Sequence, residues 1–245
     1  MRVSKYVKEY TVRSHETDCH GFLRVLSLMN VLQDIAVEHA ESFGLGLRDC
    51  LKQNLAWVGS NYLVQIMRMP KQNEVIKIET WPAEAKLWGA VRDFVVKNES
   101  NDEIIKASSQ WVLIDIERRR PVLIKKYFPD YEAVHERVIE TDFPKIPAVS
   151  EATNRVEFKV RFDDLDVNQH VNNTVYPLWA SESLDDEYRL THFVQEMEIC
   201  YKKEALYGET VVVLSDLHND ESLHSIRDKK SGDELAQCRI RWQKI

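Results

Sequence analysis

Several features that define other protein classes are missing from this chain of 245 residues. It has no apolar run of 18 residues, and the segment after Met1 alternates between polar and apolar residues instead of forming a leader. A membrane-spanning helix needs about 20 predominantly apolar residues, and a signal peptide carries an apolar segment near its start. We therefore expect a cytoplasmic protein without membrane insertion.

Cysteine is scarce as well. The four cysteines lie far apart in the chain, with no Cys-x-x-Cys spacing: Cys19, Cys50, Cys200 and Cys238. Zinc ribbons need paired cysteines, and disulfide frameworks need several at regular spacings. We expect four reduced thiols, and the sequence indicates neither a metal site nor a cofactor.

Positive charge is outnumbered by negative charge: the chain has 33 lysines and arginines and 40 aspartates and glutamates, and its net charge is −7. General affinity for nucleic acid is therefore not expected. Basic residues do cluster locally, and such clusters are usually solvated surface that gains a role only when a partner is acidic. The clusters are Arg118–Arg120 with Lys125–Lys126, Lys202–Lys203, and Arg227–Lys230.

An internal duplication is the first positive feature. Three segments of the first half resemble three segments of the second half in the same order, which indicates that the chain repeats one structural unit. The paired segments are Tyr10–Phe22 with Phe158–His170, Asn73–Trp81 with Gly208–Asp216, and Asn101–Ile114 with Ser231–Ile245.

Each half predicts one helix followed by several strands. Apolar residues recur at helical spacing from Leu28 to Phe43, and Gly44 marks the expected end. A shorter helix is expected from about Asn173, with Pro177 in its first turn. We predict an α+β protein in which each half wraps a curved antiparallel sheet around a helix. The expected halves are residues 1–120 and 151–245, joined by a proline-containing linker at 121–150.

The second half contains an unusually polar segment that the first half lacks. Asp166, Asn168 and His170 stand at alternate positions, so in an extended segment their side chains would lie on one face. A helix start follows, and its free amides could hold an oxyanion. Simple turn or capping chemistry explains the same residues, and a metal site is a further alternative.

The same segment carries a resemblance to a known family. It reads DLDVNQHVNNTVY, followed by LWASES, and it resembles the signature of the plant and bacterial acyl-acyl-carrier-protein thioesterases. The first half is also similar to that family, through segments such as VRSHETD, LMNVLQDIAVEHAESFG and ASSQWVLID. The resemblance implies a tandem double hotdog fold and hydrolysis of fatty acyl thioesters on acyl carrier protein (ACP).

The resemblance also implies a set of catalytic residues, namely Asp166, Asn168, His170 and, from the segment YKKEALYGE, Glu204. Plant members have a cysteine just after this glutamate, whereas this chain has Ala205, so we expect no cysteine nucleophile. In our hypothesis Glu204 activates water, Asn168 holds the water or the thioester oxygen, and His170, oriented by Asp166, steers the carbonyl. Amides near Asn172 to Val175 would stabilise the oxyanion.

The first half is expected to be catalytically silent and to hold the acyl chain. The position matching Glu204 falls near Pro70-Lys71. Five apolar residues could line an acyl tunnel, although each could equally be ordinary core: Met29, Leu32, Trp57, Met67 and Trp88. Acyl carrier protein is acidic, so Arg118–Arg120 or Lys202–Lys203 could dock it. A homodimer is possible.

Three alternatives remain open at this point. A thioesterase acting on acyl-coenzyme A or aryl thioesters would share the fold and differ in the carrier. A noncatalytic hotdog protein could bind acyl thioesters as a sensor, although the four catalytic residues are present and no helix-turn-helix precedes them. A dehydratase on the same fold is conceivable, but the motif matches the thioesterases better.

Overall fold

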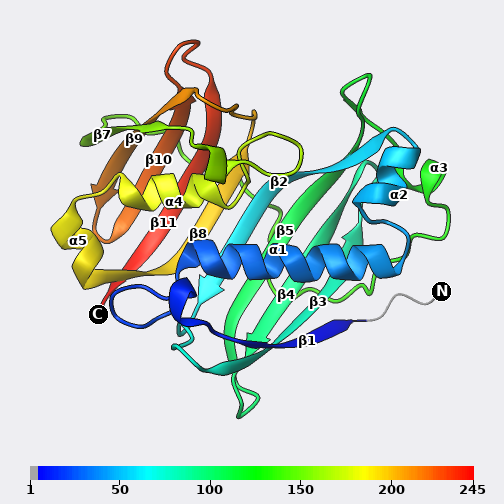
Figure 1. The fold of residues 1–245 in the computed structure, drawn as a ribbon, viewed down its shortest axis with the longest axis horizontal. Helices are drawn as coiled ribbons and strands as arrows, with labels where there is room; N and C mark the ends of the chain where they lie inside the picture. Colours follow the sequence, from blue (N-terminus) through cyan, green and yellow to red (C-terminus); the bar gives the residue numbers. More distant parts are fainter. Residues whose placement is uncertain (1–4) are drawn as a thin grey trace. The chain divides into compact units, whose positions relative to one another are not determined.

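A computed structural model describes residues 5–245 and divides them into two compact units, one ending at Asp142 and the other running from Phe143 to Ile245. Each unit is an antiparallel sheet with a helix lying across one face, α1 in the first unit and α4 in the second (Figure 1). Within residues 5–245, no helix has the length and apolar content that crossing a bilayer requires.

The first unit places its strands in the order β1-β3-β4-β5-β2, and each neighbouring pair is antiparallel. The element bounds are β1 Tyr6–Thr11, η1 Ser14–Glu16, α1 Val25–Ser42, α2 Leu47–Lys52, β2 Leu55–Ile66, β3 Val75–Ala85, β4 Gly89–Lys97, β5 Glu103–Asp115, β6 Arg120–Pro121 and α3 Ile124–Tyr127.

The second unit repeats this arrangement, with its strands in the order β7-β9-β10-β11-β8. Its elements are β7 Asn154–Lys159, η2 Phe162–Asp164, α4 Val175–Glu182, α5 Asp186–Thr191, β8 His192–Tyr201, β9 Thr210–His218, β10 Glu221–Asp228 and β11 Glu234–Lys244. The register repeats as well, because Thr11 pairs with Val75 in the first unit and Lys159 pairs with Thr210 in the second. The duplication inferred from the sequence is therefore confirmed.

Helix α1 forms where its apolar spacing predicts it. Leu28, Leu32 and Ile35 are almost completely buried, and a fully buried side chain of this size contributes roughly 1.5–3 kcal/mol. The helix ends at Ser42, and Gly44 adopts a left-handed backbone with φ of 70°, which a residue without a Cβ adopts at little cost. The helix therefore holds the sheet of the first unit by burying one continuous apolar face.

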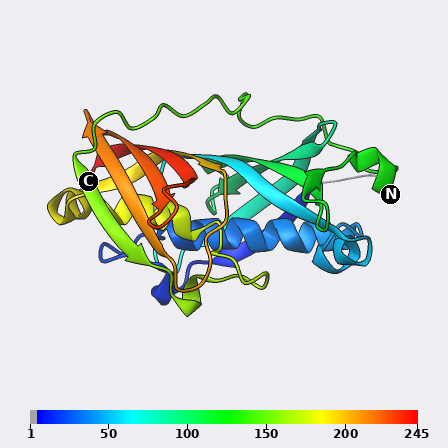
Figure 2. The same cartoon turned by 90° about the horizontal axis from the view of Figure 1, so that it is seen from above.

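The expected linker at 121–150 is largely without regular structure, but part of it packs on the first unit. Val134 and His135 donate backbone hydrogen bonds to Pro82 and Ala83 on β3, and Trp81 donates its indole hydrogen to the carbonyl of Glu136. This segment lies on the face of the sheet opposite α1 (Figure 2). The predicted division at residues 120 and 150, with one role for each half, stays a prediction.

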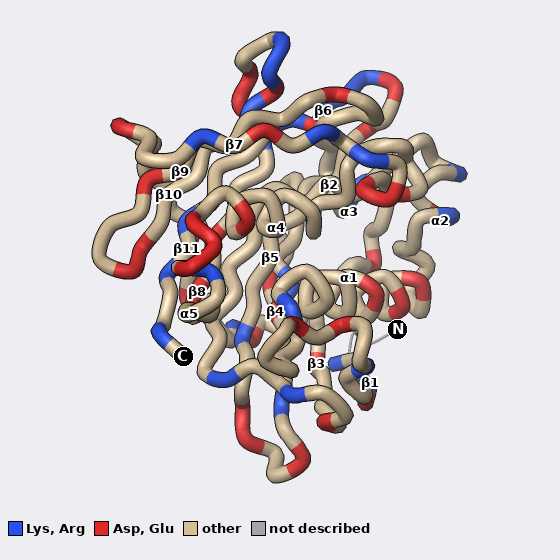
Figure 3. Tube along the Cα trace, turned by 60° about the vertical axis from the view of Figure 1, so that its left-hand side comes forward, with Lys and Arg blue, Asp and Glu red and all other residues tan. Residues whose placement is uncertain are grey.

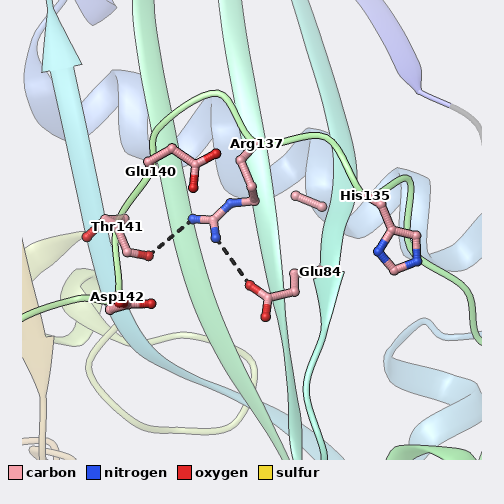
Figure 4. A pocket seen from close by; sticks show the side chains of 7 residues that line it. Glu84, His135, Arg137, Glu140, Thr141 and Asp142 are labelled. Atoms are coloured by element: carbon pink, nitrogen blue, oxygen red, sulfur yellow. Dashed lines mark hydrogen bonds and ion pairs between the residues drawn. The ribbon is translucent and has the colours of Figure 1, made fainter.

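Arg137 fastens this segment to the sheet. Its guanidinium contacts Glu84 at 3.2 Å and donates to the carbonyl of Thr141 at 3.4 Å (Figure 4). It also contacts Asp93 at 3.3 Å. Asp93 is fully buried, and burial raises the pKa of its carboxyl group despite these donors. A cleft beside Arg137 is lined by Ala83, Glu84, His135, Arg137, Glu140, Thr141 and Asp142.

Candidate active site

The polar segment of the second unit is a tight turn, so the extended arrangement considered for its alternating residues does not occur. The amide of Asp166 donates to the carbonyl of His170 at 2.8 Å, and the amide of Gln169 donates back to Asp166 at 3.0 Å. Gln169 has a φ of 66°, in the left-handed region that an extended chain does not use. Short acidic side chains favour such turns because they hydrogen-bond to nearby backbone amides.

The turn nevertheless brings the three predicted residues together, with the Asp166 carboxylate at its centre. One carboxylate oxygen accepts the amide of Asn168 at 2.8 Å and that of His170 at 3.3 Å, and the other accepts the Asn168 side chain at 3.3 Å. Within the described chain no hydrogen bond joins Asp166 to the His170 ring. Asp166 therefore positions His170 through its backbone.

Glu204 lies in the loop after β8 and faces His170. The His170 Nε2 and Glu204 Oε2 atoms are 3.5 Å apart, and the two side chains are 36% and 42% exposed. The amide of Val171 donates to the carbonyl of Ala205 at 3.0 Å, which ties the two loops together next to the pair. An imidazole and a carboxylate at this distance, open to solvent on one side, can share and pass a proton with a bound water.

Two tyrosines that the sequence reading missed support this arrangement. The Tyr176 hydroxyl accepts the amide of Ala205 at 3.0 Å, and the Tyr201 hydroxyl donates to the carbonyl of Asn173 at 2.9 Å. Their rings meet edge to face at 5.7 Å, and burial raises the pKa of Tyr176 to about 12. The sequence offers one signal for these two tyrosines, which is their position. Tyr176 ends the segment DLDVNQHVNNTVY, and Tyr201 begins the segment YKKEALYGE.

The amides proposed for an oxyanion are mostly occupied. Within Asn172–Val175, the amide of Asn172 donates to Asp164, and those of Thr174 and Val175 donate to the side chain and carbonyl of Asn172. In the part of the chain that the structure describes, the amide of Asn173 donates to no protein acceptor. This amide is therefore the one in the predicted group that can donate to a developing oxyanion.

The first unit contains the same turn. The amide of Asp18 donates to the carbonyl of Phe22 at 2.8 Å, and its carboxylate accepts the amides of His20 and Phe22 at 2.9 and 3.0 Å. Gly21 has a φ of 80° where Gln169 stands in the second unit. The turn is thus a property of the duplicated unit, and it does not by itself create an active site.

The residues that face each other across this turn differ between the units. Leu23 donates to the carbonyl of Pro70 at 2.8 Å, which is the counterpart of the bond from Val171 to Ala205. Phe22 therefore matches His170, and the position matching Glu204 is Met69, one residue before the predicted Pro70-Lys71. A phenyl ring and a thioether cannot exchange protons with water, so the first unit has no acid-base pair here.

The five residues predicted to line the acyl tunnel all belong to the first unit but differ in exposure. Met29 and Leu32 are buried on α1, and Trp57 packs against Tyr131 with ring centroids 6.3 Å apart. Met67 and Trp88 are 51% and 54% exposed. Their role toward an acyl chain stays a prediction.

Neither a metal cluster nor a reactive thiol accompanies the His170–Glu204 pair. Among residues 5–245, no three histidine, cysteine, aspartate or glutamate side chains are grouped to hold a metal ion. Ala205 is fully buried, and Cys200 lies on β8, where it pairs with Gln237 of β11.

Comparison with known proteins identifies the family. Residues 3–131 match the model of the acyl-ACP thioesterase N-terminal domain, and residues 148–244 match that of the C-terminal domain. Similar proteins include an oleoyl-acyl carrier protein thioesterase of Coriandrum sativum, 26% identical over 98% of this chain and 77% of that protein. A palmitoyl-acyl carrier protein thioesterase of Cuphea hookeriana is 27% identical over 96% of this chain and 61% of that protein.

Solved structures share the fold. An oleoyl thioesterase from Lactobacillus plantarum superposes with a TM-score of 0.87 at 24% identity, covering 99% of this chain and 97% of that one. The 12:0-ACP thioesterase from Umbellularia californica gives a TM-score of 0.84 at 24% identity, covering 98% of both chains. These likenesses confirm the double hotdog fold. Because the two family models together cover most of the sequence, the chain belongs to the acyl-ACP thioesterase family and is a thioester hydrolase.

Proposed function

We propose that this protein hydrolyses the thioester between a fatty acyl chain and ACP, which releases the free fatty acid and ends chain elongation. The observation that carries the proposal is the contact of His170 with Glu204 at 3.5 Å, beside the turn built on Asp166. The family of the chain supplies the substrate class, and the geometry supplies an acid-base pair that can activate water.

In this mechanism Glu204 removes a proton from a water molecule, and the resulting hydroxide adds to the thioester carbon. The carbonyl oxygen becomes an oxyanion, toward which the amide of Asn173 donates. When the carbon–sulfur bond breaks, the thiolate of the prosthetic arm takes a proton from His170, and the proton on Glu204 then passes to His170. The products are a fatty acid and the free thiol, and both side chains end in their starting protonation states.

The neighbouring residues position this pair. Asp166 holds the backbone of His170 and Asn168, and the Asn168 side chain is placed to orient the water or the thioester oxygen. Tyr176 holds the amide of Ala205, next to Glu204. These contacts fix the reacting groups before substrate arrives, which lowers the cost of organising them in the transition state.

We assign the acyl chain to the N-terminal half, residues 1–120, and catalysis to residues 151–245. The first unit lacks an acid-base pair at the corresponding turn, since Phe22 and Met69 stand there, and it provides the larger helix and the more extensive apolar face. Met29 and Leu32 on α1 and Trp57 on β2 are our candidates for contact with the chain, together with Met67 and Trp88 at more exposed positions.

The acidic carrier also gives the basic clusters a possible role. Lys202 forms an ion pair with Glu234 at the start of β11, and Lys203 forms one with Asp233 just before that strand, so much of their charge is compensated within the protein. Arg118–Arg120 lie exposed around the turn between β5 and β6 (Figure 3). We favour Arg118–Arg120, an exposed run of three arginines, for long-range attraction of the carrier, which predicts a rate of association that falls with added salt. A cytoplasmic location and a homodimer also remain proposals.

Hydrolysis assays with matched carriers test the proposed function. We would measure kcat/KM of the wild type for one series of acyl chains presented on ACP and on coenzyme A. Rapid cleavage of acyl-ACP with a preference over acyl-coenzyme A is expected. A preference for coenzyme A would favour the alternative carrier, and tight binding without turnover would point to a sensor.

A further inference from the structure

Four exposed apolar side chains flank the His170–Glu204 pair. Soluble proteins usually leave large apolar side chains exposed singly, so a group of them on adjoining segments indicates a contact surface. We name this group the apolar collar; its exposed fractions are 74% for Phe162, 81% for Val167, 47% for Leu206 and 64% for Tyr207.

The collar is joined to the catalytic residues through the backbone. Val167 lies inside the turn, and Leu206 forms an isolated β-bridge with His170. Tyr207 follows directly, and its ring meets that of Phe162 edge to face at 6.3 Å. Three collar residues therefore lie in the two loops that carry His170 and Glu204, and the fourth contacts one of them, so a molecule that delivers a thioester to this pair arrives next to the collar.

The duplication provides an internal control for the collar. The bridge between Phe22 and Lys71 in the first unit is the counterpart of the bridge between His170 and Leu206. By this alignment the four collar positions are exposed and polar or small in the first unit, where they are Ser14, Cys19, Lys71 and Gln72. The same turn therefore folds without apolar residues, and folding alone does not account for the collar.

Three positive side chains close to the collar in the sequence form ion pairs within the protein. Arg161 pairs with Asp164 at 2.6 Å, and Lys203 pairs with Asp233 at 2.7 Å. Lys202 pairs with Glu234 in the same way. The surface around the catalytic pair therefore offers apolar contact rather than net positive charge, and it suits an apolar area on a partner.

We infer that the apolar collar is the docking surface for ACP, which places an apolar area of the carrier against Phe162, Val167, Leu206 and Tyr207 while its prosthetic arm reaches His170. This inference rests on the proposed function, because ACP is the macromolecule that has to bind beside His170 and Glu204 in every turnover. Apolar burial at close range complements charge attraction at long range.

The test replaces collar residues by those of the silent unit. In the double variant Phe162→Ser with Tyr207→Gln, we would measure kcat/KM for the same acyl chain on ACP and on coenzyme A. Coenzyme A carries the same type of arm without the protein, so the ratio of the two values isolates contact with the carrier. We expect the ratio to fall at least tenfold. An unchanged ratio overturns the inference.

A matched control is Leu190→Ser on α5, an element that contains no collar residue, where the side chain is 56% exposed. Its ratio should equal that of the wild type, which separates the collar from a general effect of removing surface apolar residues. Circular dichroism and thermal unfolding establish that both variants are folded. If the double variant does not fold, Val167→Cys, which also introduces the residue of the silent unit, takes its place in the same assay.

Two further measurements separate this inference from the proposed function. Binding of a non-hydrolysable acyl-ACP analogue should weaken at least tenfold in the double variant even if the wild type proves inactive, so the collar can stand when the catalytic proposal fails. Analytical ultracentrifugation tests whether a second copy of this chain covers the collar instead. If the wild type is a dimer and the double variant is a monomer, a second copy covers the collar and the inference is wrong.

Discussion

The two units share a turn, a strand order and a hydrogen-bond pattern, yet they differ at the two positions that face each other beside the turn. The first unit has Phe22 and Met69 there, and the second has His170 and Glu204. The scaffold that presents these side chains is therefore independent of the reaction. Under the proposed function, the acid-base pair on one copy and the apolar residues on the other give the two copies different roles.

Exchanging these residues should have the largest effect. Replacing Glu204 by methionine, its counterpart in the first unit, removes the proposed base, and kcat for acyl-ACP is expected to fall about 10²- to 10⁴-fold. His170→Phe should have an effect in the same range. Because the His170 and Glu204 side chains are 36% and 42% exposed and thus largely outside the core, the melting temperature should change little. Steady-state hydrolysis and thermal unfolding of the same preparations check this.

Glu204→Gln sharpens the prediction, because it preserves the size of the side chain and removes only its basicity. Turnover within a few-fold of the wild type in Glu204→Gln would show that another group activates the water. Met69→Ala in the first unit is the matched control, and it should leave hydrolysis at the His170 site intact while lowering stability, since Met69 is only 8% exposed.

A second difference between the units lies beneath α4 and concerns pH. His224 on β10 is buried and bonded to Ser215 at 2.8 Å and to Ser222 at 2.7 Å, whereas Phe94 occupies the corresponding place on β4. Burial lowers the pKa of His224 from an ordinary value of 6.5 to about 3. The folded state therefore holds this side chain neutral where the unfolded chain would take up a proton.

The sign of the pH dependence follows. Above pH 6.5 both states leave His224 neutral and stability is complete, whereas below 6.5 only the unfolded state gains a proton. The free energy of unfolding should then fall by about 1.4 kcal/mol for each pH unit, from 6.5 down toward 3. In His224→Phe, which introduces the residue of the first unit, this component should vanish. Urea unfolding between pH 5 and 8 compares the two slopes, and parallel slopes would contradict the assignment.

Much of the fold was predictable because it depends on local patterns. The apolar spacing from Leu28 to Phe43 and the weak repeats around Asp18 and Asp166 report on elements that form from neighbouring residues. The contact between His170 and Glu204 depends on two loops far apart in the sequence. It was predicted only through the resemblance to the thioesterases, and no spacing rule could have supplied it.

The local geometry of the site was predicted less well. Alternating polar residues suggested an extended segment, but the Asp166 carboxylate competes for the nearby amides and stabilises a turn. The roles of Tyr176 and Tyr201 escaped prediction because each acts through a hydrogen bond to a distant backbone atom. The exposure of Met67 and Trp88 likewise depends on tertiary packing that side-chain type does not reveal.

Substitution of the two matched aspartates should distinguish an effect on stability from an effect on catalysis. The expected loss of kcat is smaller than for Glu204 or His170. Asp166→Ala and Asp18→Ala each remove a carboxylate that accepts two backbone amides, and each should lower stability by about 1 kcal/mol. Only Asp166→Ala should also reduce kcat, by about 10- to 100-fold, because it alone positions His170. Equal losses of kcat in the two variants would mean that the first unit takes part in the reaction.

Asp166→Asn distinguishes a positioning role from a direct one. An asparagine oxygen can still accept the amides of Asn168 and His170, so the turn should be retained. If Asp166 only holds the backbone, Asp166→Asn should recover most of the activity and the pH profile of the wild type. A variant that stays as slow as Asp166→Ala would show that the negative charge itself is required.

The smallest effect concerns the fourth residue of each turn, counted from Asp18 and Asp166, which has a left-handed backbone in both units. Gly21 adopts it without strain, and a Cβ at that position would meet no atom within 4 Å, so backbone strain alone should decide the outcome of Gly21→Gln. Since a non-glycine residue in this conformation costs about 1 kcal/mol, this variant should lower stability by that amount. Gln169→Gly should relieve the same strain, but it also adds freedom to the unfolded chain, and the gain should stay below about 1 kcal/mol. Chemical denaturation resolves both changes. Because Gln169 adjoins His170, a loss of kcat in a stabilised Gln169→Gly variant would indicate that strain in the catalytic turn is what holds the imidazole against Glu204.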